Sequence, residues 1–519
     1  MALANRLQAY VLAASLAAWS SAAAAGELRG TVARQDDGRP LAVKLFVEDA
    51  DGELHVMPGE PEYKTQQWYA PNPPRFSYVQ GAFAMPLPQG KYRITAMKGF
   101  GYRDWEGEVE VRARQETPIK IELEQMVLLE EDGWYCGDMH IHGTTTGPML
   151  RAEDVNLAVH TFYSSQKPYR PKIDAEQSDR THICCEDQEI EHWFFGNVFY
   201  FNIPTAVQDP RTENPPQTPM FFYDRQSHRM GGINLRWLRS RPFDLEGRSP
   251  GQRQPELAVS AALGYLDAWS VMDNSMQNEL DDPRRTWTGD GWGRGSLYQN
   301  TYQTWYRLLN CGLRISASAG TSYGRLSRLG FNRVYVKCPD GLSLPHFADG
   351  LKRGDGFVSN GPLLWLSAEG KLPGNGLALP GPDRVKLSVR LACKYPLDLL
   401  EIVHNGRVIL QKKVGALQRP LIWEETVAVE KPGWYAARCF GTHRPRYRHS
   451  AAHNLFAHTN PMVVTVAGKG PSSAEDAAVF LKEIDALIDY APNVPEPLRA
   501  ETLKVFHQAR AFYAEMADR

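Results

Sequence analysis

The sequence predicts a multidomain protein of mixed α/β plus all-β class, with a central α/β domain between two small β-sandwich domains and a C-terminal helical hairpin. Three observations predict it. The chain has 519 residues, enough for about three domains of ~150 residues each. In the N-terminal part and the part before the C-terminal tail, short runs alternate between apolar and polar residues and are separated by turn signals. The central part mixes apolar, strand-like runs with helical ones. The expected domain limits are 26–126, 127–370, 371–468 and 469–519.

The first 25 residues resemble an export signal. Arg6 supplies positive charge, residues 10–19 form a short apolar run, and the A-x-A pattern of residues 23–25 precedes Gly26. This order is typical of a Sec-type signal peptide cleaved after Ala25. The apolar run is shorter than the roughly 20 residues that a membrane anchor needs. We therefore expect a bacterial periplasmic or secreted protein without a transmembrane segment after cleavage.

Residues 26–126 are expected to form the first β-sandwich. Residues 43–48 alternate between apolar and polar side chains, Asp51-Gly52 is a hairpin turn signal, and residues 53–56 return as the second strand. Residues 81–83 and 87–94 continue the pattern. Short alternating strands separated by turn signals are typical of a small sandwich.

The central segment, residues 127–370, alternates between strand-like and helical patterns. Residues 194–201 are a long apolar run that suits a buried strand. Residues 257–263 and 301–309 are expected to be helical, and residues 317–320 and 333–337 to be strands or strand ends. This alternation predicts an α/β domain.

The last two segments repeat the β pattern and then change to helices. Apolar and polar side chains alternate again in residues 385–389, 400–403 and 461–466, and Asn405-Gly406 is a turn signal. This pattern predicts a second β-sandwich. In the tail, Ser472 or Ser473 is expected to cap a first helix. The apolar faces of the two predicted helices consist of Phe480, Leu481, Ile484, Leu487 and Ile488, and of Leu503, Phe506 and Ala509.

Charge and cysteine usage exclude some classes of protein. The 58 basic and 60 acidic side chains give a formal net charge of −2. A nucleic-acid-binding protein usually has a basic excess or stripe, so no nucleic-acid partner is expected. The seven cysteines are widely spaced and include no C-x-x-C. This pattern favours core thiols over a dense disulfide scaffold or a cysteine zinc site.

The strongest chemical signal is the stretch GWYCGDMHIHG, residues 133–143. Side chains two residues apart in a strand point to the same side, so His140 and His142 are expected to project together. Two neutral imidazoles can ligate one divalent zinc, manganese or iron ion. The acidic stretch 186–189 can supply a carboxylate. The alternative is a partly exposed strand with two unrelated histidines and a solvated acidic turn.

A second motif points to different chemistry. Residues 320–324 satisfy G-x-S-x-G, the nucleophile elbow of α/β-hydrolases, with Ser322 as the candidate nucleophile. That motif needs a strand before it and a helix after it. The following residues 325–329 soon meet Gly330 and another strand pattern, so the sequence argues against a serine hydrolase.

Several motifs together resemble the carbaryl-hydrolase-like (CehA/McbA) branch of the polymerase and histidinol phosphatase (PHP) superfamily. The stretch at 133–143 is similar to its GW-x-x-GDxHxH entry motif. The similarity continues through RAEDVNLAV, CEDQE, YRLLNCGLRISASAGTSYG, GFNRVYV, GDGFVSNGPLL and FAHTNPMVV. It covers nearly the whole mature chain, and it places Ser322 in the family's SAG turn rather than in a nucleophile elbow.

The resemblance implies a PHP-like distorted (β/α) barrel with a metal at the carboxyl ends of its strands. It implies hydrolysis of an ester, carbamate or phosphoester bond by a metal-activated water, with a small-molecule or envelope-derived substrate. Carried over by motif, His140, His142 and Glu186 are the expected metal ligands. Asp138 is a candidate catalytic residue, expected to accept a hydrogen bond from a ligand histidine. Glu153 or Asp154 is expected beside the metal or as a further ligand.

The sequence also departs from the family pattern. Ser275 stands where the family commonly has a histidine, and Asp273 is the candidate catalytic stand-in. The family's acidic stretch is replaced by residues 234–243, where Arg236, Arg239 and Arg241 suggest an anionic substrate. Two readings follow: the remaining ligands hold a catalytic metal, or the chain is a non-catalytic binding or structural protein of the envelope with a degraded site. His160, His182 and His192 lie near enough in the sequence to compensate for the missing ligand; the alternative is that each is structural or exposed.

Overall fold

The computed structural model describes residues 25–59, 75–163, 172–192, 195–208, 218–237, 254–273, 297–322, 329–443 and 454–518. They form two compact units. The first holds the described residues up to Val127 together with Pro148–Asp154, and the second holds the rest. The predicted signal peptide, apart from Ala25, lies outside the described residues. Among the described helices, none is long and apolar enough to cross a membrane.

The first unit is built on one sheet with strand order β7-β6-β2-β4-β5-β1-β8, and β3 pairs with β2. The predicted hairpin of β2 and β3 is confirmed, with Glu48 opposite Leu54. The end strands β7 and β8 approach each other, so the sheet curls around its apolar core. The strands are β1 (Gly26–Arg34), β2 (Ala42–Asp49), β3 (Leu54–His55), β4 (Ser77–Gln80), β5 (Ala82–Leu87), β6 (Gly90–Met97), β7 (Trp105–Val111) and β8 (Glu116–Leu123).

The second unit contains a 16-stranded sheet with the main order β16-β15-β14-β13-β12-β10-β9-β17-β18-β26-β25-β22-β23. Its strands are β9 (Trp134–Ile141), β10 (Leu157–Tyr163), β11 (Lys172–Ile173), β12 (Ile183–His192), β13 (Gly196–Phe201), β14 (Ile233–Arg236), β15 (Ala268–Met272), β16 (Ser316–Ala319), β17 (Arg333–Lys337), β18 (Gly356–Ser359), β20 (Leu377–Leu379), β22 (Leu397–His404), β23 (Arg407–Gly415), β25 (Gly433–Gly441), β26 (Leu455–Thr459) and β27 (Met462–Val466). A separate three-stranded sheet holds β19 (Leu363–Ala368), β21 (Asp383–Ala392) and β24 (Leu421–Val429). Because β18 pairs with β26, the predicted central and C-terminal β segments share one sheet.

The half of the large sheet that carries the histidines is of mixed direction. β10 is parallel to both β9 and β12, and β15 is parallel to β14 and β16, whereas β13 is antiparallel to both β12 and β14. The chain just after β16 turns back onto β9, where the Ser322 N–H donates to the His140 carbonyl at 2.6 Å. Within the described residues no ladder joins β16 to β9, so the sheet is open. The predicted mixed α/β and all-β class is confirmed, but these ladders do not form a closed barrel.

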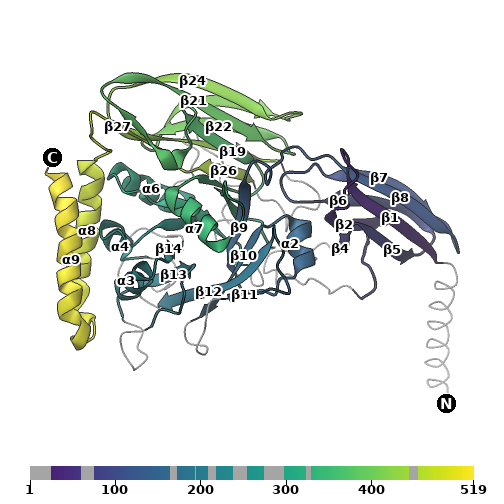
Figure 1. Cartoon of the computed structure of the whole chain (residues 1–519), viewed down its shortest axis with the longest axis horizontal. Coiled ribbons are helices and arrows are strands. Elements are labelled where there is room, and N and C mark those ends of the chain that lie inside the picture. Colours follow the sequence, from purple (N-terminus) through teal and green to yellow (C-terminus); the bar gives the residue numbers. More distant parts are fainter. Residues whose placement is uncertain are drawn as a thin grey trace, which may run out of the picture. The chain divides into compact units, whose positions relative to one another are not determined.

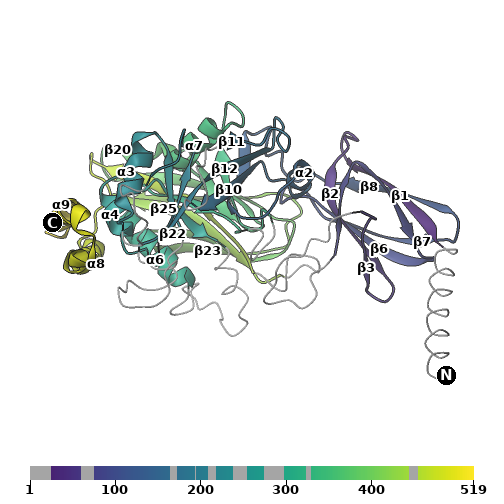
Figure 2. The same cartoon turned by 90° about the horizontal axis from the view of Figure 1, so that it is seen from below.

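Helices cover the second unit, and two of them form the predicted C-terminal hairpin (Figure 1). They are α3 (Phe221–Arg229), α4 (Leu257–Ala262), α6 (Leu297–Asn310), α7 (Leu344–Arg353), α8 (Ala474–Tyr490) and α9 (Glu496–Ala517). Ser473 caps α8 as predicted, since its hydroxyl accepts from the Asp476 N–H. Figure 2 shows α4 beside the hairpin, where the Tyr513 hydroxyl donates to the Ala258 carbonyl at 3.0 Å. The short helix α2 (Gly147–Glu153) precedes β10.

All seven cysteines lie in the described residues, and all are buried thiols without a disulfide. Cys184 and Cys185 are neighbours on β12, and burial raises the pKa of both thiols. Buried thiols of this kind behave as small apolar side chains. The expectation of core thiols is therefore confirmed.

Candidate metal centre

The two histidines of the H-x-H motif meet at the carboxyl end of β9. The Nε2 atoms of His140 and His142 are 2.8 Å apart. Glu189, on β12, places Oε2 3.5 Å from the His142 Nε2 atom. Potential ligand atoms of the three side chains all lie within 4.8 Å of one another. The predicted pairing of His140 and His142 is confirmed, and the cluster can hold a metal ion.

The cluster is largely shielded from solvent. The side chains of His140 and Glu189 are 4% and 2% exposed, and that of His142 is 9% exposed. Carboxylates and imidazoles are costly to bury unless they pair or bind a metal. The ladder between β9 and β10 shifts register between Asp138 and Ile141. A β-bulge of this kind re-aims a side chain next to a site, and here it lies at His140.

A carboxylate lies behind His140, on the side of the ring away from His142. The Asp273 oxygens are 3.2 and 3.3 Å from the His140 Nδ1 atom. The Ser270 hydroxyl donates to Asp273 at 2.9 Å, which fixes that carboxylate. A proton held on Nδ1 between His140 and Asp273 leaves the lone pair on Nε2, where it faces His142. Asp273 therefore does reach the site, as an orienting group for His140.

The charges around His140 change its acidity. Burial by itself lowers the pKa of the imidazole, because the charged form loses solvation. The carboxylates of Asp273, Glu189 and Asp138 outweigh that effect, so the pKa of His140 is raised. In the metal-free protein this site therefore attracts positive charge, which is the property that a cation-binding centre requires.

Two aromatic side chains border the same imidazole. The ring of Phe199 lies 4.6 Å from the His140 ring, centre to centre, and the ring of Trp237 lies 6.1 Å away. Phe199 is opposite Glu189 in the ladder between β12 and β13. The same pair of strands therefore supplies both a ligand atom and an apolar wall.

The structure brings Glu189, and not Glu186, to the histidines. Glu186 is in register with His160 of β10, and its carboxylate lies 3.7 Å from the Lys172 ammonium group. Side chains three residues apart in a strand point to opposite faces. Glu189 therefore faces the histidines while Glu186 does not. The alternation of β12 could have distinguished the two, but the motif resemblance selected Glu186.

Asp138 has a different task from the one expected. Its carboxylate accepts hydrogen bonds from the backbone N–H groups of Thr321 and Gly330, at 3.0 and 2.9 Å, and also from the Thr321 hydroxyl. Its contact with His140 is to the backbone N–H at 3.3 Å rather than to the ring. Full burial raises the pKa of Asp138 to about 6. Asp138 thus ties the segment after β16 to β9.

The G-x-S-x-G segment also acts through its backbone. A Cβ atom added at Gly320 would lie 2.5 Å from the His140 Cβ atom, so glycine permits the close approach of β16 to β9. Ser322 donates its backbone N–H to the His140 carbonyl. Residues 323–328 lie outside the described residues, and with them the end of the motif.

The other acidic and histidine candidates lie elsewhere. Glu153 pairs with Lys44 at 2.6 Å, and Asp154 pairs with Lys98 at 2.9 Å, all within the first unit. His160 contacts the Thr145 hydroxyl at 2.7 Å, and burial lowers the pKa of His160 to about 4. His182 contacts the Asp179 carboxylate at 3.3 Å, whereas the His192 side chain is outside the description.

The expected arginine cluster is represented by one described member. Arg236 is buried, and its guanidinium pairs with the Asp224 carboxylate and donates to the Ser260 hydroxyl at 2.6 Å. It therefore serves the packing of β14 against α3 and α4 rather than a substrate. Arg239, Arg241 and Ser275 lie outside the described residues.

The donor set fits a divalent transition metal. Two imidazole nitrogens and one carboxylate oxygen are the protein ligands of many catalytic zinc sites, and of iron sites with open positions. The Asp273 carboxylate supplies the outer hydrogen bond that ligand histidines usually make. Comparison of the chain with protein-family models and with curated proteins gives no match.

Proposed function

We propose that this protein is an exported metal-dependent hydrolase of PHP type, similar to the CehA/McbA branch. The observation that carries the proposal is the buried cluster of His140, His142 and Glu189, with Asp273 behind His140. A site with three protein ligands leaves coordination positions open for water and substrate. The motif resemblance and the way β16 turns back onto β9 support a distorted (β/α) barrel as the underlying fold.

Each residue of the site has its own task. His140 and His142 present their Nε2 atoms, and Glu189 supplies a negative oxygen that offsets part of the charge of a cation. Asp273 holds the proton on His140 Nδ1, so that Nε2 stays a donor to the metal. A bound zinc, manganese or iron ion supplies a Lewis acid and lowers the pKa of a water molecule. Ser270 keeps Asp273 in place through its hydrogen bond.

The proposed substrate carries an ester, carbamate or phosphoester bond. Phe199 and Trp237 place apolar rings beside His140, which favours an uncharged or apolar group near the reacting bond. The Arg236 guanidinium already pairs with the Asp224 carboxylate. The described part of the predicted arginine cluster therefore gives no support for an anionic substrate. Rates with matched neutral and anionic esters separate the two classes: we expect faster hydrolysis of the neutral ester, and the reverse order would contradict this assignment.

Elemental analysis combined with a hydrolase panel tests the proposal. Purified wild-type protein is expected to hold a stoichiometric transition metal and to lose esterase, carbamate hydrolase or phosphodiesterase activity on chelation. Glu189→Gln is expected to lose both metal and activity. Glu186→Gln changes a carboxylate on the same strand that faces away, so it is the matched control and should keep both.

The rival function is a non-catalytic binding or structural protein of the envelope. It predicts sub-stoichiometric metal that does not rise on reconstitution, and no difference between Glu189→Gln and Glu186→Gln. A serine hydrolase would instead resist chelators and lose activity in Ser322→Ala. Stoichiometric metal with no activity on the whole panel would favour a metal-dependent binding protein and contradict the hydrolase assignment.

A further inference from the structure

The strand β13 presents two side chains to the metal centre from one face. Asn197 and Phe199 are two residues apart in this strand, so they point to the same side. The Phe199 ring borders His140, and the Asn197 Nδ2 atom lies 3.3 Å from the Glu189 Oε1 atom. Asn197 is buried, so water does not compete for this contact. The strand therefore contacts one histidine ligand and the carboxylate ligand together.

The chemistry of the pair determines which end of the amide faces Glu189. An ionised carboxylate only accepts hydrogen bonds, and only the nitrogen of an asparagine side chain donates them. The Asn197 amide group therefore donates to Glu189 Oε1, since the reversed amide would bring two acceptor oxygens together. The other oxygen, Oε2, lies 3.5 Å from the His142 Nε2 atom. The two carboxylate oxygens thus have different surroundings: one is held by the amide, and one faces the histidines.

The backbone of Asn197 is held by two further segments. Its carbonyl oxygen accepts from the Gln254 Nε2 atom at 3.1 Å and from the Trp237 N–H at 3.3 Å. Gln254 is buried, and Gly196 makes room for it, because a Cβ atom at Gly196 would lie 2.8 Å from Gln254 Oε1. These contacts are all within the chain. Asn197 is therefore fixed in place without a contribution from a metal.

We propose that Asn197 is a positioning residue that holds Glu189 with Oε2 toward the histidines, so that the carboxylate binds the metal through this one oxygen. The inference rests on the proposed metal centre and adds how one of its ligands is oriented. Hydrogen bonds to ligating carboxylates commonly tune metal affinity in this way. Because the amide is neutral, it orients Glu189 without cancelling the negative charge that attracts the cation.

Competition with a chromophoric chelator measures the effect of Asn197 on metal affinity. Asn197→Leu removes the donor and keeps a similar shape, whereas Asn197→Ser removes it and keeps a polar group. Both variants are expected to bind metal about 10- to 100-fold more weakly than the wild type. An unchanged affinity in either variant would overturn the proposal.

Asn234 offers a matched control in the neighbouring strand β14. It is also a buried asparagine, but its amide donates to the backbone carbonyls of Asp224 and Tyr265. It is opposite Tyr200 in the ladder with β13, on the other face from Asn197. Asn234→Leu and Asn234→Ser should therefore keep the wild-type metal affinity. Equal losses at the two asparagines would overturn the proposal.

The absorption spectrum of bound Co²⁺ gives a readout that a general loss of stability would not change. The spectrum depends on the coordination geometry of the ion. At saturating Co²⁺, Asn197→Leu is expected to have an altered spectrum, because Glu189 is no longer restricted to one oxygen. Asn234→Leu should have the wild-type spectrum. A wild-type spectrum in Asn197→Leu would overturn the proposal.

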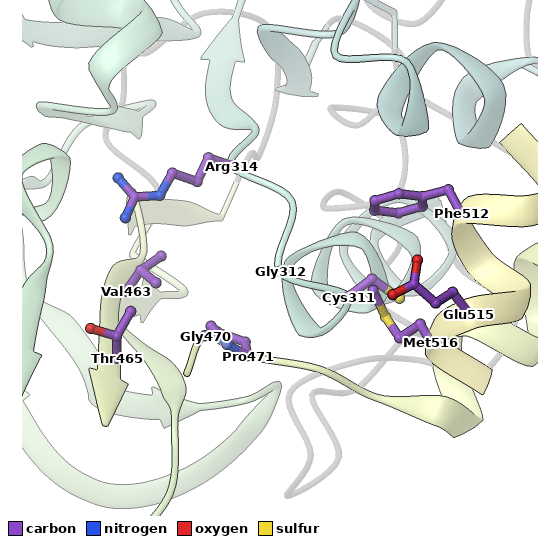
Figure 3. A pocket seen from close by; sticks show the side chains of 10 residues that line it. All are labelled: Cys311, Gly312, Arg314, Val463, Thr465, Gly470, Pro471, Phe512, Glu515 and Met516. Carbon is purple, nitrogen blue, oxygen red and sulfur yellow. The ribbon is translucent and has the colours of Figure 1, made fainter. Parts of the chain in front are cut away.

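A control is also needed for metal bound elsewhere. Cys311 and Glu515 line a cavity of about 390 Å³ between the end of α6, β27 and the last turns of α9 (Figure 3). This cavity shares no lining residue with the metal centre. Cys311→Ser should therefore leave the affinity and the Co²⁺ spectrum unchanged. A change in either would assign the measured metal to this cavity and overturn the proposal.

Crystal structures of metal-free protein separate the failure of this inference from the failure of the proposed function. A wild-type protein that binds no metal contradicts the proposed function, and the position of Glu189 then decides the inference by itself. In metal-free Asn197→Leu, the Glu189 carboxylate is expected to turn away from His142, whereas in metal-free Asn234→Leu it should stay. A carboxylate that keeps its place in Asn197→Leu would overturn the positioning role, whether or not the wild type binds metal.

Discussion

Two buried histidines of the second unit, His140 and His458, differ in what surrounds them. His458 is fully buried; its Nδ1–H donates to the Thr459 carbonyl at 2.7 Å, and its Nε2 accepts from the Tyr306 hydroxyl at 2.6 Å. Burial lowers the pKa of His458 to about 3. His140 instead has carboxylates around it and a raised pKa.

The contrast shows that burial alone does not identify a metal ligand. Both ring nitrogens of His458 are used within the fold, and aromatic rings enclose it. His140 uses Nδ1 for Asp273 and turns Nε2 toward a second imidazole and a carboxylate. His458 is therefore a structural histidine, and His140 is arranged as a ligand.

The largest expected effect is the loss of metal in His140→Ala. Removing one of three protein ligands should reduce the metal content from stoichiometric to background, as measured by elemental analysis after extensive dialysis. His458→Phe should keep the full metal content. Retention of stoichiometric metal by His140→Ala, or its equal loss in both variants, would break the distinction between the two histidines.

Asp273→Asn is expected to have the next largest effect. The amide cannot accept as a carboxylate does and no longer fixes the His140 tautomer, so metal affinity should fall about 10- to 100-fold. Competition with a chromophoric chelator measures this. Ser270→Ala should lower the affinity less, because it acts on Asp273 through one hydrogen bond. An unchanged affinity in Asp273→Asn would show that this carboxylate does not orient the ligand.

For His458 the expected effect is on folding rather than on metal. His458→Phe preserves an aromatic ring but removes the acceptor of the Tyr306 hydroxyl, which should cost about 1–3 kcal/mol of unfolding free energy. Chemical denaturation measures this change. His458→Gln, which can still accept a hydrogen bond, should recover part of it. If His458→Phe is as stable as the wild type, the described network does not stabilise the fold.

The two histidines should also have opposite pH dependence in metal-free protein. His458 stays neutral in the fold with a pKa of about 3, whereas an unfolded histidine titrates near 6.5. The unfolded chain then binds more protons between pH 3 and 6.5, so His458 lowers stability as pH falls through that window. His140 has a raised folded pKa, so its stabilisation is present below about 6.5 and is lost as pH rises through that folded value.

These opposite pH dependences can be checked by measuring the unfolding free energy of the metal-free wild type and of each histidine variant between pH 4 and 8. His458→Phe should flatten the loss of stability on the acid side, and His140→Ala should remove the stabilisation on the same side. Metal affinity should fall as pH drops through the raised pKa of His140, because the proton competes with the metal. Identical pH profiles for both variants would contradict the assignment.

Much of the local structure could be predicted from the sequence. The alternation around Asp51-Gly52 predicted the hairpin of β2 and β3, and the periodicity with Ser473 predicted the helices α8 and α9. The spacing of His140 and His142 predicted that they share a site. These signals are local, since each depends on residues that are close in the chain.

The rest depends on contacts between distant segments. The bulge in β9 and the approach of Gly320 to His140 arise from how β9 meets β10 and the end of β16, which no local pattern records. To choose between Glu186 and Glu189, one must know which face of β12 points toward the histidines. A sequence motif does not give this orientation. The sequence predicts that Asp138 bonds to a histidine ring, but its carboxylate accepts hydrogen bonds from Thr321 and Gly330, far along the chain.

The most direct test of the central claim is a crystal structure with an anomalous difference map at the absorption edge of the metal found by elemental analysis. We predict a peak about 2.0–2.2 Å from His140 Nε2, His142 Nε2 and a Glu189 oxygen, with Asp273 on the other side of the His140 ring. A peak ligated by Glu186, or no peak at the His140 and His142 pair in metal-loaded protein, would contradict the account.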